Sequence, residues 1–371
     1  MVHQQIGIRD TEYTGAGFGK LLLFGEHAAV YGHPAVGLAL PLRTTVRLVD
    51  EGPRVEPTRS ASPTGLSAPQ LPESDRIIVQ ALWEDLFRIA AGDSTAGGIA
   101  AGGSPDQLYD QSFLSSLRGR QFRTEIGSDV PRSRGLGSSA AACAALAGAW
   151  AALGAEAALS STLHDIWLLA HSLEHRFHGT PSGIDTGLAV YGGCRSFHFT
   201  GAELPDTAAL PPPDFPLVAA AVPRRSDTKG LVAGIRRRHE AGDRIVHDTL
   251  TQLGRISEQA IGALTAAAPA DTLAAAANEA DSLLVGLDLD SDQLRYGLQL
   301  AKEYGALGGK ISGAGGGGAF LAIFGKDRAE AAAAFAAALP AQLRQKGGEA
   351  AAIVISPPHL TTPSTKSSPT R

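Results

Sequence analysis

Apolar and polar positions alternate along the chain in two rhythms, which predict strands and helices. Apolar runs and strict alternation with β-branched residues are typical of strands, whereas apolar positions three and four apart predict amphipathic helices. Strands are predicted over residues 20–25, 34–50, 121–130, 189–199, 217–222 and 350–355, and a strand–glycine loop–strand unit over 310–324. Helices are predicted over residues 76–90, 138–153, 162–178, 231–268, 271–285, 292–304 and 328–345. The chain is therefore expected to mix helices and strands.

Breaks in this pattern suggest where domains divide. Residues 51–75 are rich in Pro, Ser and Gly, residues 91–106 are rich in Gly and Ala, and neither segment is periodic. A chain of 371 residues exceeds one typical core, so two domains are the default. The proline cluster at 211–213 is the best boundary between them. We therefore predict two domains and a disordered Ser/Thr/Pro tail, over residues 1–213, 214–356 and 357–371.

Composition narrows the classes of function. The net charge of −5 argues against a general nucleic-acid binder. Cys143 and Cys194 form no disulfide framework or metal motif, and the first residues show no signal peptide, so a cytoplasmic location is expected. Residues 135–155 are uncharged and long enough to span a membrane. Because Ala, Gly and Ser dominate this segment, we predict a buried helix there and no membrane or nucleic-acid partner.

A glycine loop precedes that helix. The sequence Gly135-Leu-Gly-Ser-Ser-Ala140 enters the predicted helix directly, where free backbone N–H groups and the helix dipole favour an anion. The hydroxyls of Ser138 and Ser139 could reach phosphate or Mg²⁺. The alternative is a tight turn in which a serine merely caps the helix.

Two other nucleotide motifs fit poorly. A Walker A loop is absent at Lys20 and Lys310, because neither lysine is followed by Ser or Thr. Gly135-x-Gly137-x-x-Ala140 matches the loose dinucleotide fingerprint, but Pro131 and two arginines interrupt the strand that should precede it. A second glycine run, at 313–318, leads into a strand instead of a helix, which suits close packing against a ligand or another loop.

Four polar residues share one face of the helix predicted over 162–178. His171, Glu174, His175 and His178 are spaced i, i+3, i+4 and i+7. His171-x-x-Glu174-His175 matches an inverted zinc-protease signature, which is the main rival enzyme class. A polar face without a function is the simpler alternative.

Two carboxylates and a lysine could serve phosphoryl transfer. The turn Gly179-Thr-Pro-Ser-Gly-Ile-Asp185 can direct Asp185 into a cleft near Glu174. One carboxylate could hold Mg²⁺ and the other could accept a proton from a hydroxyl, as this chemistry requires. Lys20 begins an apolar strand and needs an anionic partner if buried, for which we propose Asp185. The alternatives are an Asx turn at Asp185 and a lysine at Lys20 that reaches solvent.

These segments together resemble the GHMP kinases, and among them most closely the mevalonate kinases. Gly135 to Ala140 resembles the phosphate loop of the family, and Lys310 to Gly318 resembles its C-terminal motif. The segments at 19–32, 178–185 and 227–236 are also similar to mevalonate-kinase motifs, so five motifs recur in order over residues 15–325. Arg132 and Arg134 depart from the family pattern, and residues 51–75 and 91–106 match nothing in it.

The resemblance implies a fold and a reaction. The fold would be α+β with two domains, namely an N-terminal domain with a left-handed βαβ unit and a ferredoxin-like C-terminal domain, and the active site would lie in the cleft between them. The implied reaction phosphorylates the 5-hydroxyl of (R)-mevalonate with ATP and Mg²⁺ in isoprenoid precursor synthesis. A homodimer is left open. Another GHMP kinase, such as phosphomevalonate kinase, is the alternative, although Arg195, Arg224 and Arg225 are not clearly placed to bind a second phosphate. A non-catalytic relative should lack Lys20, Glu174 or Asp185, and all three are present.

The resemblance also assigns residues. Asp185 would be the catalytic base and Lys20 its activating partner, while Glu174 with Ser138 or Ser139 would ligate Mg²⁺. The ATP phosphates would be bound by Gly135, Leu136, Gly137, Ser138, Ser139 and Ala140. The substrate would be bound by Lys20, Glu26, His27, Asp185, Thr228 and Gly315.

Overall fold

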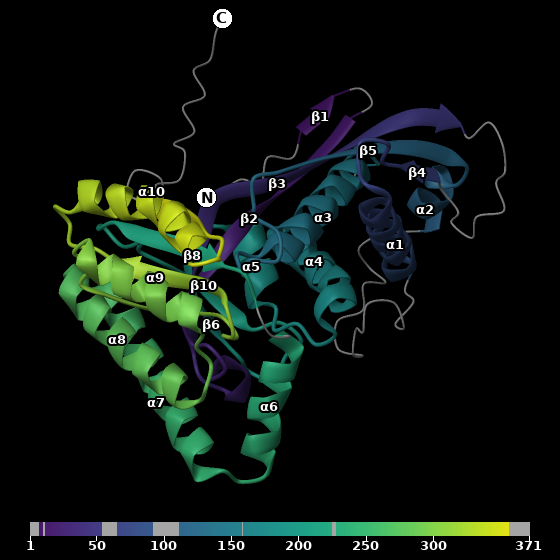
Figure 1. Ribbon diagram of the computed structural model, residues 1–371. Coiled ribbons are helices and arrows are strands. Elements are labelled where there is room, and N and C mark those ends of the chain that lie inside the picture. Colours follow the sequence, from purple (N-terminus) through teal and green to yellow (C-terminus); the bar gives the residue numbers. More distant parts are fainter. Residues whose placement is uncertain are drawn as a thin grey trace, which may run out of the picture.

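The computed structural model describes residues 7–9, 12–53, 65–91, 111–157, 159–224 and 228–355. Two β-sheets organise these residues, one formed before residue 213 and the other after it. Each sheet carries its own helices, and the two lie against one another in Figure 1. The domain boundary proposed at 213 therefore falls between the last strand of the first sheet and the first strand of the second.

The first sheet is long and mostly antiparallel. Its strands follow the order β1-β2-β3-β5-β4, β6 pairs with β3, and β7 pairs with β6. Their bounds are β1 Gly7–Arg9, β2 Glu12–Phe24, β3 Ala35–Pro53, β4 Gly65–Ser67, β5 Arg120–Ser128, β6 Cys194–His198 and β7 Asp206–Leu210. Only the β4–β5 pair is parallel among the described strands, and α1 lies in the connection between them, as a βαβ unit requires.

The helices of this half cover the sheet and surround α3. They are α1 Glu73–Ala90, α2 Gln111–Leu117, α3 Ser138–Glu156, α4 Leu163–His178 and α5 Ile184–Tyr191, and a 3-10 turn, η1, spans Ala29–Tyr31. A side chain at Gly15 of β2 would lie 2.1 Å from the carbonyl oxygen of Ala145, and one at Gly17 would lie 2.2 Å from that of Ala141. Small residues on β2 and α3 therefore let the helix backbone approach the sheet closely. Among the described helices, α3 alone is long and apolar enough to cross a membrane, and it is mostly buried inside the protein, as predicted.

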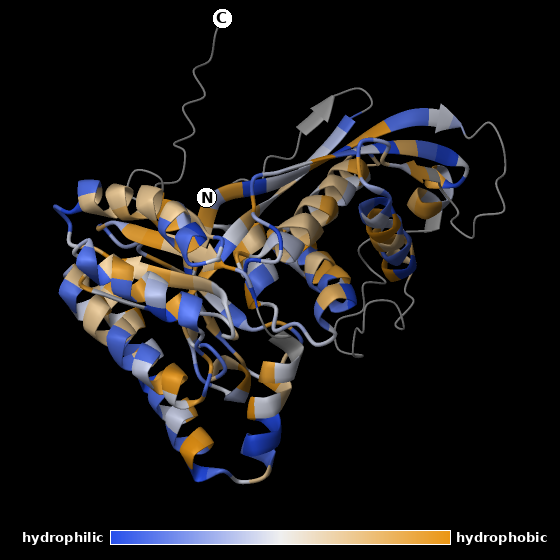
Figure 2. Ribbon diagram, viewed as in Figure 1, coloured by the Kyte–Doolittle hydropathy of each residue, from blue (hydrophilic) through white to orange (hydrophobic). Residues whose placement is uncertain are grey.

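The second sheet has ferredoxin-like topology. Strands β8 Leu217–Val222, β9 Gly308–Ser312, β10 Gly318–Ile323 and β11 Ala351–Ile355 are all antiparallel in the order β11-β8-β10-β9. Its helices are α6 Thr228–Glu240, α7 Arg244–Thr265, α8 Ala270–Gly286, α9 Asp292–Glu303 and α10 Ala329–Gln345. Every residue of β8 and β10 is buried, which explains their uninterrupted apolar runs, and Figure 2 shows polar positions on the surrounding helices.

Several boundaries differ from the sequence-based prediction. Residues 189–191 were expected in a strand but end α5, because a short apolar run fits a buried helix equally well. Strand β2 begins at Glu12 instead of residue 20, and the segment 51–75 contains β4 and the start of α1. The helix predicted over 231–268 is divided into α6 and α7. Strand β7 and helix α2 were not predicted. Residues 92–110 and 356–371, which include most of one glycine-rich segment and the predicted disordered tail, lie outside the described residues.

Candidate active site

Lys20 and Asp185 meet at the centre of the N-terminal half. A β-bulge between Phe18 and Lys20 breaks the β2–β3 register, and such bulges often redirect a side chain beside an active site. Asp185 occupies the first turn of α5, after Gly183 in the left-handed conformation (φ 79°). Lys20 Nζ lies 2.9 Å from Asp185 Oδ2, with the lysine side chain 8% exposed and the aspartate 34% exposed. The buried ammonium thus holds a carboxylate whose other side remains open to a ligand.

The glycine loop is built directly over Lys20. Gly135 (φ 82°) and Gly137 (φ 80°) are left-handed, and Gly137 precedes the first residue of α3. The Lys20 amide donates to the carbonyl oxygen of Leu136 at 2.9 Å, and a side chain at Gly137 would lie 2.6 Å from Lys20 Cγ. Only glycine therefore lets the loop rest on the lysine. The first N–H groups of α3, at Ser138, Ser139 and Ala140, have no partner within the helix and can bind an anion.

Glu174 adds a buried carboxylate beside this loop. Ser139 Oγ lies 3.5 Å from Glu174 Oε1 and 3.2 Å from His178 Nε2. Burial, followed by the charge of Asp185, raises the pKa of Glu174 to about 8, although Lys20 and Ser139 act to lower it. Its Oε2 is buried without a hydrogen-bond partner among the described residues. A carboxylate in this position needs a nearby cation to remain ionised. Carboxylate oxygens suit Mg²⁺, which takes few protein ligands besides phosphate and water.

The second glycine run, in the C-terminal half, packs against the first glycine loop. A side chain at Gly135 would lie 3.0 Å from the Ala319 amide nitrogen, so the two glycine segments touch. Gly315 (φ 82°) faces Leu289, whose carbonyl oxygen lies 2.3 Å from the position that a Cβ would occupy. Gly315 therefore packs backbone against backbone, and it does not line the cavity at Asp185.

Glu26 and His27, both predicted to bind substrate, do not line the cavity that contains Lys20 and Asp185. The Glu26 carboxylate is fully buried in an ion pair with Lys310 of β9, so its predicted contact with substrate stays a prediction. His27 is left-handed (φ 58°), and its Nε2 lies 3.3 Å from the carbonyl oxygen of Ala314. Both residues instead join the end of β2 to the second glycine run. Thr228 begins α6, and its side chain lies outside what the structure describes.

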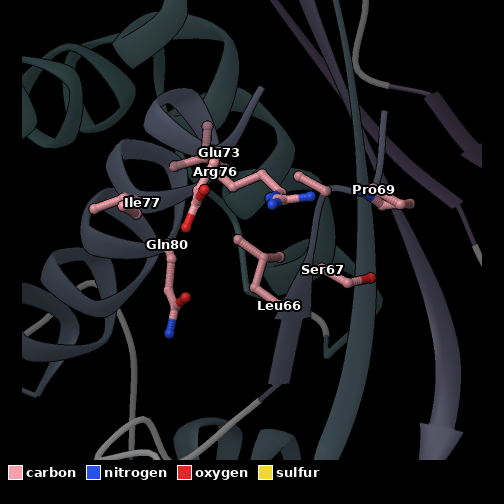
Figure 3. Close-up of a pocket in the computed structure, with 9 residues that line it drawn as sticks. Leu66, Ser67, Pro69, Glu73, Arg76, Ile77 and Gln80 are labelled. Atoms are coloured by element: carbon pink, nitrogen blue, oxygen red, sulfur yellow. The ribbon is translucent and has the colours of Figure 1, made fainter. Parts of the chain in front are cut away.

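A cavity of about 890 Å³ lies beside the Lys20–Asp185 pair and the glycine loop. It is lined by Lys20, Asp185, Ser138 and Ser139, by an apolar side that includes Ile78, Leu82 and Phe177, and by Pro223, Arg224 and Glu349 of the C-terminal half. The candidate site therefore lies between the two halves. A separate cavity of about 420 Å³ lies between α1 and β4 and contains neither Lys20 nor Asp185; Figure 3 shows its lining residues, which include Leu66, Ser67, Pro69, Glu73, Arg76, Ile77 and Gln80.

The zinc-protease hypothesis is wrong for the described part of the chain. No group of three or more His, Cys, Asp or Glu there could hold a metal ion. His175 Nδ1 donates to the carbonyl oxygen of Gly179 at 2.7 Å, and His171 is buried with a ring centroid 5.0 Å from that of His175. Within this motif, His175 fixes the turn that leads to Asp185, and Glu174 lies beside Ser139.

Two histidines should make the fold sensitive to acid. Burial lowers the pKa of His27 and of His171 from 6.5 to about 4. Between pH 6.5 and pH 4 the unfolded chain binds more protons at these histidines than the folded chain does. The stability that comes from keeping the two histidines neutral in the folded state is therefore complete above pH 6.5 and is lost as the pH falls toward 4. A shift of this size corresponds to on the order of 3 kcal/mol for a buried histidine. We expect His171→Asn to flatten the decline of the urea midpoint between pH 6.5 and 4, and an unchanged slope would contradict the assignment.

Arg224 and Arg134 are two charged cavity residues that the sequence analysis did not assign to the site. Arg224 follows β8, and Arg134 precedes the glycine loop and pairs with the exposed Glu349. An arginine after a buried strand carries no local motif. The signal that could have found Arg134 is its departure from the small residues common at this position in the family.

Comparisons with known proteins match this chain to one family of kinases. The family model for the GHMP kinases N terminal domain matches residues 107–193, and that for the GHMP kinases C terminal matches residues 268–344. The chain is 30% identical to the mevalonate kinase of Thermococcus gammatolerans, covering 85% of this chain and 90% of the relative. The mevalonate kinase of Thermococcus sibiricus is 29% identical with the same coverage. The crystal structure of the L. major mevalonate kinase in complex with R-mevalonate aligns with a TM-score of 0.70 and 22% identity, over 96% of this chain and 99% of that one.

The 30% identity to a relative matched over 90% of its length, together with the two family models, shows that the chain belongs to the GHMP kinases, a family of enzymes that phosphorylate small molecules. Within that family the relatives compared above are mevalonate kinases, to which this chain is similar over most of its length. The two-domain α+β fold expected from the sequence is confirmed.

Proposed function

We propose that the protein transfers the γ-phosphoryl group of ATP to the 5-hydroxyl of (R)-mevalonate, giving 5-phosphomevalonate and ADP. The observation that carries this proposal is the Lys20–Asp185 pair, with Nζ and Oδ2 2.9 Å apart, directly below the glycine loop. Mevalonate is the substrate that the names of the curated relatives indicate. The buried free cysteines Cys143 and Cys194 suit a reducing cytoplasm, which we propose as the location.

In the proposed mechanism the loop holds the nucleotide and Asp185 prepares the acceptor. The N–H groups of Ser138, Ser139 and Ala140 bind the phosphate oxygens of ATP at the start of α3. The proton of the 5-hydroxyl passes to Asp185 as the hydroxyl oxygen forms a bond to the γ-phosphorus. The bond from that phosphorus to the bridging oxygen breaks, and the electron pair leaves with ADP. Lys20 stabilises the carboxylate and the developing charge near it.

Glu174 and the loop serines are the residues that would hold Mg²⁺. The unpartnered Oε2 of Glu174 and the nearby Ser139 hydroxyl present oxygen ligands next to the phosphate position. When bound, the ion neutralises phosphate charge. The role of Glu174 is then to supply a fixed anionic ligand, and burial against α3 prevents this side chain from turning toward solvent.

The test is ADP release measured with one acceptor at a time. We expect turnover with (R)-mevalonate and far slower release with phosphomevalonate, galactose or homoserine, and EDTA should abolish the reaction. A preference for phosphomevalonate would favour the alternative function, since Arg224 gives the cavity a cation that could bind a phosphorylated substrate. ADP release that is equal with and without any acceptor would reject both.

A further inference from the structure

Arg224 enters the active-site cavity from the C-terminal domain. The chain leaves β8 after Val222, and Pro223 and Arg224 then line the cavity that contains Lys20 and Asp185. A side chain at Gly317 would lie 2.4 Å from the carbonyl oxygen of Pro223 and 2.9 Å from the Cα atom of Arg224. The second glycine run therefore holds the backbone of Arg224 closely against the site.

The guanidinium occupies space that two glycines leave free. Arg224 Nη2 lies 3.1 Å from the position that a Cβ would take at Gly135, and Nε lies 3.1 Å from the equivalent position at Gly318. Each glycine belongs to a different loop, and both have positive φ angles, of 82° and 83°. The side chain thus lies where the two glycine loops meet, beside Gly135 at the start of the phosphate-binding segment.

The charge of Arg224 acts on that of Asp185. Partial burial lowers the pKa of Arg224, and the main opposing influence is the charge of Asp185, so the two groups lie within electrostatic range. By contrast, neighbouring Arg134 is paired with Glu349 and Arg132 with Asp75. No ion pair or hydrogen bond joins Arg224 to a residue that the structure describes. A partly desolvated guanidinium with five donors favours a planar or tetrahedral oxyanion as its partner.

We propose that Arg224 is a further catalytic residue, whose guanidinium contacts the γ-phosphoryl group during transfer. Arg224 lies beside the glycine loop and within electrostatic range of Asp185, so its guanidinium can reach the group that passes from ATP to the acceptor. An arginine at that point stabilises charge on the phosphoryl oxygens and, in other phosphoryl-transfer enzymes, raises kcat by roughly 10³–10⁵-fold. This inference rests on the proposed kinase function but does not depend on which acceptor is used.

The first experiment separates the γ-phosphoryl group from the rest of the nucleotide. Calorimetry would measure the binding of ATP and of ADP to the full-length wild type, to Arg224→Met and to Arg224→Lys. We expect Arg224→Met to weaken ATP by about tenfold, or about 1.4 kcal/mol, with ADP affinity unchanged. Arg224→Lys keeps the charge but loses the bidentate donor geometry, so its affinity for ATP should lie between those of the wild type and Arg224→Met. Equal weakening of ATP and ADP, or no change in either, would overturn the proposal even if mevalonate proves to be the wrong acceptor.

Kinetics provide the second measurement, with the best acceptor found for the wild type. We expect Arg224→Met to lower kcat by about 10³-fold while the KM for the acceptor changes by less than about threefold. Free guanidinium ion should restore part of the kcat of Arg224→Ala and leave the wild type unaffected, which a structural role would not produce. Arg237→Met, which removes the same charge from the exposed face of α6, is the matched control. A rise confined to the acceptor KM would assign Arg224 to the substrate's own anionic group and reject the proposal.

Discussion

Replacing Asp185 by alanine is expected to lower kcat by about 10⁴-fold, the upper end of what a general base contributes. The carboxylate lies at the start of α5, 2.9 Å from Lys20 Nζ. Both Asp185 and Lys20 line the cavity. ATP should still bind, because the glycine loop and the first amides of α3 do not involve the aspartate side chain. Rapid-quench measurement of ADP formation, with ATP affinity from calorimetry, checks both expectations.

Lys20→Met provides the second half of this test. If the lysine acts mainly through Asp185, the Lys20→Met/Asp185→Ala double variant should be scarcely slower than Asp185→Ala alone, since residues that act as a unit are not additive. Asp206→Ala, which removes an exposed carboxylate from β7, is the matched control and should keep wild-type kcat. Asp185→Ala with full activity, or with ATP binding lost in parallel, would remove the assignment of the base.

The Lys20–Asp185 pair and the glycine loop are predictable from the sequence because their requirements are local. Gly135 and Gly137 are needed where the backbone is left-handed, and the serines that follow start a helix, so one short segment carries the whole signal. The turn before Asp185 is similarly compact. Their convergence with Lys20 is an inference from chemistry, because a buried lysine requires an anion.

Features that depend on strand order could not be derived in this way. Arg224 reaches Gly135 only because β8 and β10 are antiparallel neighbours, so the residues after β8 meet the glycine run that precedes β10. The strand predicted over 189–199 begins as the end of α5, since a short apolar run has no period that separates helix from strand. Glu26 was predicted to bind substrate because of its place in a sequence motif. Its ion-pair partner, Lys310, lies 284 residues away in the chain, so no local pattern could predict that pair.

That distant pair leads to the largest expected effect on stability. Lys310 and Glu26 form an ion pair in which both side chains are 0% exposed, and Lys310 Nζ also donates to the carbonyl oxygen of Ile311 at 2.6 Å. Burial is the main influence that raises the pKa of Glu26, and Lys310 opposes it. Lys310→Met would leave a carboxylate buried without its counter-ion, so we expect the free energy of unfolding to fall by about 3–5 kcal/mol, measured by urea denaturation.

The double variant Glu26→Gln/Lys310→Met decides what the pair contributes. Replacing both charges removes the uncompensated carboxylate, so it should recover much of the stability that Lys310→Met loses. Because the pair joins the end of β2 to β9, recovered stability with a reduced kcat would show that the charges also position the second glycine run against the phosphate loop. Lys326→Met, which breaks a solvent-exposed pair with Asp214, should leave the urea midpoint nearly unchanged. Equal midpoints for Lys310→Met and Lys326→Met would contradict a buried, energetically coupled pair.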